Sequence, residues 1–187
     1  MQHYRTRLII AAAIFATILV AAAIDDLVPG TRWRILERTD KITDAKTYLV
    51  STIAKEVRPG PLADETRLVL EIIPKEILPG DKLKYRCNIS LYNSGAAFGV
   101  DTATIITRFD REKATSATWK TLPPDYIIAR APQSASVFDK LSSSTNLTVR
   151  FKTIVGETKT LTFETAGLTN AIRQVKKNYL KAKEVRP

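Results

Sequence analysis

The sequence is poor in the residues that build disulfides, metal centres and nucleophilic active sites. Its 187 residues include one cysteine, Cys87, and one histidine, His3. A disulfide within the chain needs two thiols, a zinc site needs three or four cysteine, histidine or acidic ligands, and a catalytic triad needs an imidazole in the folded part. The composition therefore excludes disulfide scaffolds, zinc fingers and most histidine-dependent hydrolases. The seven glycines form no glycine-rich phosphate loop.

What remains is an ordinary globular composition with an excess of positive charge. Hydrophobic residues make up 44% of the chain and charged residues 26%, which is enough to build one packed core. The 29 basic and 19 acidic residues give a formal net charge of +10.

The N-terminal 24 residues have the layout of an export signal. Arg5 and Arg7 precede an uncharged run, residues 8–24, and two aspartates follow it. As a helix this run of 17 residues would be about 25 Å long, slightly short of the roughly 30 Å hydrocarbon core of a bilayer. Residues 1–24 are therefore expected to be a hydrophobic helix that serves as a signal peptide, cut after the alanines at 21–23, or as an uncleaved signal anchor.

The charges beside this run predict its orientation. Arginines on the short side keep the N-terminus in the cytoplasm and place residues 25–187 outside it. We expect a protein anchored on the periplasmic face of the inner membrane, or free in the periplasm if the signal is cleaved.

The exported part reads as a series of strands. Residues 82–91 alternate without exception between apolar and polar side chains, a period that a half-buried strand has and a helix does not. Residues 146–152 and 158–163 repeat the pattern around a turn and predict a hairpin. Cys87 lies on the apolar side of its strand and is expected to be a core residue. Further predicted strands are 33–36, 46–53, 66–73, 100–109, 115–120 and 126–131.

Two segments have helical spacing instead. Residues 134–143 place Ala135, Phe138 and Leu141 on one face, with Ser134 as a possible N-cap. Residues 168–184 carry an apolar stripe and begin after Gly167; the stripe consists of Ala171, Ile172, Val175 and Tyr179. Eight or nine short strands with two helices and no linker predict one mainly β domain, residues 25–187, an antiparallel β-sandwich or barrel. We take the sandwich as the expected architecture, with one short helix and a basic C-terminal helix.

The positive charge is concentrated in that last helix. Residues 173–187 contain six basic residues and one acidic residue, a net charge of +5. The candidate interaction surface consists of Arg173, Lys176, Lys177, Lys181 and Lys183. It could attract anionic lipid, cell-wall polymer or an acidic protein face, or it could serve only solubility and the helix dipole. Nucleic acid is not an expected partner, because neither stacking aromatics nor a recognition motif accompanies the charge.

Other chemistry is sparse. Trp33 and Trp119 could serve as platforms for a ligand, although burial in a β-rich core is the favoured interpretation. The carboxylates are scattered, and no local spacing pairs two of them as acid and base. We therefore expect no catalytic residues, metal or cofactor, and a carboxylate-based hydrolase is the least favoured alternative.

Several of these features occur together in one known family. Trp33, the segments 39–47 and 85–87, and above all the stretch from 107 to 172, with TRFD, Trp119, LTVRF and TLTFETAGL in order, resemble the TagO/VasI-like family of type VI secretion-associated envelope proteins. The resemblance implies a small exported β-rich domain without known catalytic residues, related also to prophage proteins. It departs from the family pattern near 177–180, where a cysteine and a tryptophan are common and Tyr179 stands here, so that Cys87 lacks the family's usual partner.

The expected function follows from these observations. We expect a non-enzymatic exported or membrane-anchored envelope protein that acts by contact with an envelope or secretion-machinery protein, as a type VI secretion accessory factor. The alternative is a cell-wall or lipid-binding module of phage or prophage origin.

Overall fold

The computed structural model describes residues 26–55, 65–79 and 82–184. The predicted signal segment, residues 1–24, lies outside the described residues. Within the described part of the chain, no helix is both long and apolar enough to cross a membrane.

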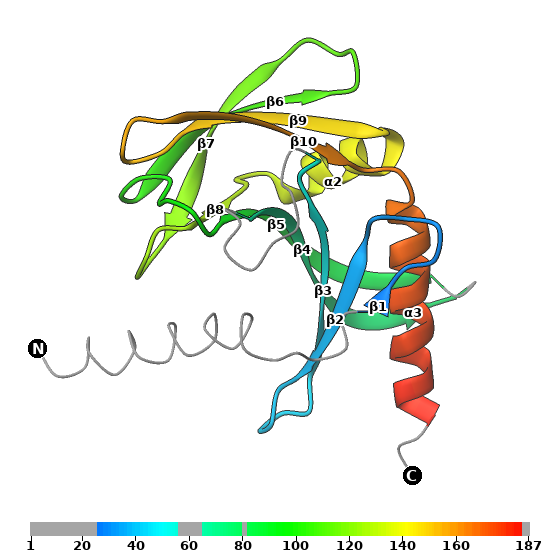
Figure 1. Cartoon of the computed structure of the whole chain (residues 1–187). Helices are drawn as coiled ribbons and strands as arrows, with labels where there is room; N and C mark the ends of the chain where they lie inside the picture. The colour runs from blue at the N-terminus through cyan, green and yellow to red at the C-terminus, as the bar shows by residue number, and fades with distance from the viewer. Residues whose placement is uncertain (1–25, 56–64, 80–81, 185–187) are drawn as a thin grey trace, which may run out of the picture.

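The described residues form a mainly β domain, as the alternation predicts (Figure 1). Its sheet has ten antiparallel strands in the order β1-β2-β3-β4-β5-β8-β7-β6-β9-β10. The strands are β1 (Asp26–Leu27), β2 (Arg34–Thr39), β3 (Lys46–Ile53), β4 (Thr66–Leu78), β5 (Lys82–Asn93), β6 (Thr102–Phe109), β7 (Thr115–Leu122), β8 (Ile128–Arg130), β9 (Asn146–Lys152) and β10 (Thr158–Glu164).

The period of two in the sequence decides which side of each strand faces the core. In β4 the alternate residues Leu68, Leu70 and Ile72 have no exposed surface, and in β5 the same holds for Ile89 and Leu91. β9 and β10 form the predicted hairpin, in which Val149 is paired with Leu161. The strand boundaries agree with the sequence prediction to within a few residues, except that β4 extends to Leu78 and that β1 was not predicted.

The sheet curls, so that strands from its two ends meet (Figure 1). Beyond the end of β3, the amide of Lys55 donates to the carbonyl of Thr162 in β10 at 2.7 Å. The curled sheet encloses one hydrophobic cluster to which strands from both ends contribute, for example Val50 and Phe163. One continuous sheet is what the structure describes, and its division into the two layers of a sandwich stays a prediction.

Both predicted helices are present with the predicted bounds: α2 (Ser134–Ser143) and α3 (Leu168–Glu184). Two details of α2 were predicted wrongly. Gln133 occupies the N-cap position and provides no side-chain cap, while Ser134 bonds across to β5, where its Oγ accepts from the amide of Ile89 at 3.2 Å. Ala135 is exposed, and Val137 packs against the core in its place, beside Phe138 and the buried Leu141. The reason is that α2 packs against β5, so the side of the helix that carries Val137 faces the core.

Candidate functional site

The start of α3 is fixed by a glycine. Gly167 has a φ of +82°, and its carbonyl accepts hydrogen bonds from the amides of Asn170 at 3.0 Å and Ala171 at 3.1 Å. A Cβ at this position would lie 2.3 Å from Cγ2 of Thr31, in the turn between β1 and β2. The first turn of α3 therefore lies directly against the β1–β2 turn, an approach that only glycine allows.

The apolar side of α3 holds the helix along the domain. Leu168, Ala171 and Val175 are buried, while Ile172 and Tyr179 are partly buried and pack against the core, so the predicted stripe is confirmed. α3 packs against β2 and β3. Tyr179, near the C-terminal end of α3, lies close enough to Tyr48 of β3 to affect the ionisation of Tyr48. The pKa of Tyr48 is raised mainly by burial and to a smaller extent by its neighbours, Tyr179 among them.

The opposite side of α3 carries the predicted interaction surface. Arg173, Lys177, Lys181 and Lys183 are exposed, and Lys176 is partly exposed. We call these five residues the basic face. Arg173, Lys177 and Lys181 lie on the solvent side, whereas Lys176 and Lys183 border the apolar stripe, each four residues after one of its members, Ile172 and Tyr179.

The charge of the basic face is not neutralised locally. Some exposed lysines elsewhere in the domain have acidic partners, as Lys84 has in Glu76 and Lys140 has in Glu112, whereas Lys113, Lys120 and Lys152 make no ion pair in the described residues. Within the described residues, Lys176, Lys177 and Lys181 make no ion pair. Arg173 donates only to the neutral Asn170 side chain at 3.2 Å, and Lys183 lies over the ring of Tyr179 at 5.2 Å. The basic face therefore presents uncompensated positive charge, which favours contact with an anionic surface.

The two tryptophans belong to the core. Trp33 is 0% exposed and Trp119 is 1% exposed, so neither offers a ring face to a ligand in this conformation. The indole Nε1–H of Trp33 donates to the carbonyl of Thr165 at 3.4 Å, which gives this buried polar group a partner. The burial that the sequence favoured is observed, and the alternative of a ligand platform has no exposed surface to support it.

Cys87 is also a packing residue. It is a free cysteine that packs against the hydrophobic core. Burial, and to a lesser extent the nearby Glu71 carboxylate, raise the pKa of the thiol to about 12. Since the thiolate is the nucleophile, this environment makes Cys87 unreactive.

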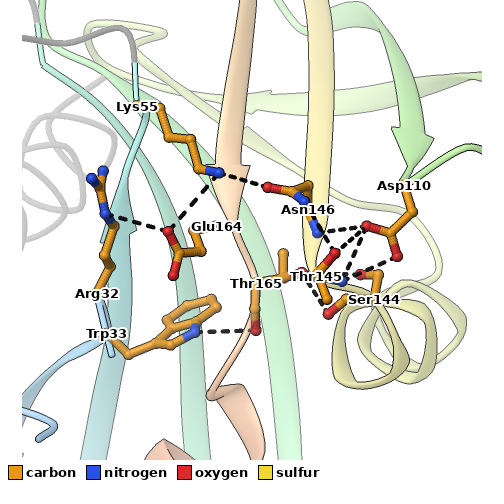
Figure 2. Close-up of polar contacts among 9 residues, drawn as sticks. All are labelled: Arg32, Trp33, Lys55, Asp110, Ser144, Thr145, Asn146, Glu164 and Thr165. Atoms are coloured by element: carbon orange, nitrogen blue, oxygen red, sulfur yellow. Dashed lines mark hydrogen bonds and ion pairs between the residues drawn. The ribbon is translucent and has the colours of Figure 1, made fainter. Parts of the chain in front are cut away.

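A polar seam joins the two ends of the sheet (Figure 2). Glu164, the last residue of β10, pairs with Arg32 at 3.5 Å and with Lys55 at 3.9 Å. Lys55 Nζ also donates to Oδ1 of Asn146 at 2.7 Å. These contacts link the start of β2, the end of β3 and the β9–β10 hairpin, so their evident role is to hold the curled sheet closed.

Asp110 extends this seam. The backbone of Asp110 has a φ of +45°. Its carboxylate oxygen Oδ1 accepts hydrogen bonds from Oγ1 of Thr145 at 2.7 Å and from the amide of Asn146 at 2.8 Å. The Thr145 hydroxyl, followed by the neighbouring backbone amides, holds the pKa of Asp110 below its ordinary value. The carboxylate ties the end of β6 to the start of β9 across 35 residues of sequence, so no local spacing could have indicated it.

Three acidic side chains in the described part of the chain have a shifted pKa, and none is raised. No three histidine, cysteine or acidic side chains there are grouped so that they could hold a metal ion. Asp40, Glu76 and Asp110 have lowered pKa values, because backbone amides, a lysine and a threonine respectively favour their charged forms. A general acid needs a raised pKa, and these three carboxyls are shifted the other way.

Comparison with protein-family models and with curated proteins finds no match to this chain. Among solved structures, the crystal structure of invasion associated protein B from Bartonella henselae is similar to it, with 12% sequence identity and a TM-score of 0.47. The similarity covers 76% of this chain and 90% of that chain. A likeness at this level supports no inference about function, and the resemblance to the TagO/VasI-like family stays a prediction.

Proposed function

We propose that this chain is a non-enzymatic envelope protein, exported or anchored at the periplasmic face of the inner membrane, that acts by contact through the basic face of α3. The expected partner, an envelope or secretion-machinery protein with an acidic surface, belongs to this proposal. So do the accessory role in type VI secretion, the β-sandwich architecture and the N-terminal hydrophobic helix.

One observation carries the proposal. The lysines of α3 are exposed without ion-pair partners in the described residues, on a helix whose other side is fixed to the core. A rigid helix presents its charges in a constant arrangement, and concentrated charge of one sign attracts and orients a partner of opposite sign. A cell-wall or lipid-binding module, the alternative expected from the sequence, would use the same surface.

The test replaces charges on α3 and follows contact in intact cells. The full chain carries a photo-cross-linking amino acid at the exposed position of Arg173, and the cross-linked products from the envelope are identified by mass spectrometry. The variant Lys176→Glu, Lys177→Glu, Lys181→Glu, Lys183→Glu is expected to lose these products, because attraction becomes repulsion. Circular dichroism should show an unchanged fold, since none of the four side chains is buried.

A control variant makes the same change in net charge elsewhere. Exposed cations on β6, the β6–β7 turn, β7 and β9 are replaced: Arg108→Glu, Lys113→Glu, Lys120→Glu and Lys152→Glu. This variant should keep the cross-linked products. Equal yields from the α3 variant and the wild-type chain would overturn the proposal.

A further inference from the structure

We infer that the four lysines of the basic face, Lys176, Lys177, Lys181 and Lys183, rest on the anionic headgroups of the membrane that residues 8–24 are expected to enter. The inference rests on the proposed function, which makes this helix the contact surface, and it assigns these four lysines to anionic lipid in place of an acidic protein. It depends on the direction in which two segments run through the domain.

The first segment is β1. Asp26 is paired with Ile35 and Leu27 with Arg34, in antiparallel register. Following the chain backwards from Leu27 to Asp26 therefore leads along β2 toward Thr39. Asp26, where the described residues begin, therefore lies on the side of β1 that faces the end of β2.

The second segment is α3. It begins against Thr31, just before β2, and at Tyr179 it has reached Tyr48, a residue of β3 that is paired with Glu37 near the end of β2. α3 thus runs alongside β2 in the same direction, and both β1 and α3 contact β2. The four lysines consequently lie toward the end of the domain at which β2 finishes, the same end that Asp26 faces.

The covalent chain then limits how far this end can be from a membrane. Only Asp25 separates the apolar run from β1 in the sequence, and a chain advances at most about 3.6 Å per residue. Anchoring by residues 8–24 would hold Asp26 within roughly a Debye length, ~10 Å, of the bilayer surface, a distance over which salt screens charges only in part. Four lysines near an anionic surface each favour binding by about fivefold.

Charge complementarity favours lipid as the occupant at this place. The membrane leaflet that faces the tethered domain is a continuous anionic layer when acidic lipids are present, and it requires no shaped pocket. The described residues offer a basic helix and no carboxylate pair partner for it, which fits a planar charged surface. An acidic protein at the same end is the alternative that the experiment separates.

The experiment uses the full chain in nanodiscs without other proteins. One preparation contains phosphatidylglycerol beside phosphatidylcholine, and the other contains phosphatidylcholine alone. Lysines are acetylated with a water-soluble amine reagent, and the rate at each position is measured by mass spectrometry. In anionic nanodiscs the four lysines should react several-fold more slowly than in phosphatidylcholine alone, and salt at about 1 M, where the Debye length is ~3 Å, should restore their rates.

Lys113, Lys120 and Lys152, which are exposed on other strands and turns, serve as internal controls and should react alike in both preparations. Equal rates for the α3 lysines in both lipids would overturn the inference. If the envelope cross-links described above still require the four lysines, the proposed function survives and its occupant is a protein. Loss of both effects would overturn the inference and the proposed function together.

Discussion

Gly167 and Thr31 approach so closely that a single methyl group at Gly167 would overlap the Thr31 side chain: its Cβ would lie 2.3 Å from Cγ2. The two residues are far apart in sequence: Gly167 directly precedes α3, and Thr31 lies in the turn before β2. This contact sets the position of α3, and with it the place at which the basic face is presented.

Gly167→Ala is therefore expected to destabilise the domain by about 2–3 kcal/mol, through the overlap and the strain of alanine at positive φ. Urea unfolding followed by circular dichroism measures the loss. Gly30→Ala is the matched control, because Gly30 also has a positive φ, +72°, but nothing lies within 4 Å of its Cβ position. It should cost only the strain, about 1 kcal/mol.

A rescue variant separates overlap from strain. Thr31→Ser removes Cγ2 and keeps Oγ1, which donates to the carbonyl of Val28 at 2.9 Å and accepts from the amide of Trp33 at 3.1 Å. In the Thr31→Ser background the cost of Gly167→Ala should fall only part of the way to that of Gly30→Ala, because Cβ of residue 31, 2.9 Å from the new methyl position, remains. An unchanged cost would show that the contact with Thr31 does not position the helix.

Asp110 should make the stability of the domain depend on acid pH. Its pKa is lower in the folded chain than in the unfolded chain, so the unfolded chain takes up more protons as the pH falls below about 4. The stability that the carboxylate supplies is present above this pH and is lost as the pH decreases further. Asp110→Asn should flatten this part of the profile, because asparagine tolerates positive φ and still accepts a hydrogen bond but does not titrate.

The measurement is thermal unfolding between pH 2 and 7 for both chains. Asp125→Asn is the control, since Asp125 is exposed and makes no hydrogen bond within the described residues; its profile should parallel that of the wild-type chain. An identical profile for Asp110→Asn and the wild-type chain would contradict the role given to the carboxylate.

The tryptophans should behave as core residues in fluorescence. The chain has two, so Trp33→Phe and Trp119→Phe each leave one emitter. Both emitters are expected to show blue-shifted emission and little quenching by iodide, because each is at most 1% exposed. Strong quenching of either one in the folded chain would restore the ligand-platform interpretation.

Cys87 should be almost inert until the domain opens. With its pKa raised to about 12 by burial, its reaction with a disulfide reagent should keep accelerating well above pH 9, whereas a free thiol, with a pKa of about 8.5, levels off there. Stopped-flow absorbance on the folded chain and on the chain in urea compares the two. A folded-state rate that levels near pH 9 would show that the thiol is accessible.

Much of the local structure could be predicted from the sequence. The alternation in β5 and the β9–β10 hairpin, and the apolar stripe of α3, are recorded in residue spacing alone, because a strand repeats every two residues and a helix every 3.6. The concentration of lysines on α3 is equally a sequence property. Even so, the neighbouring strand β5 decided which side of α2 is buried, and Val137 rather than Ala135 faces the core.

Only the tertiary structure decided how these elements meet. The sheet order places β8 between β5 and β7, Asp110 bonds to Thr145, and Gly167 lies against Thr31. The direction in which β1 runs relative to α3 was likewise decided by the tertiary structure. Each of these depends on contacts between residues distant in the chain, which the burial of one shared core selects from many possible pairings, and spacing along the sequence contains no record of that choice.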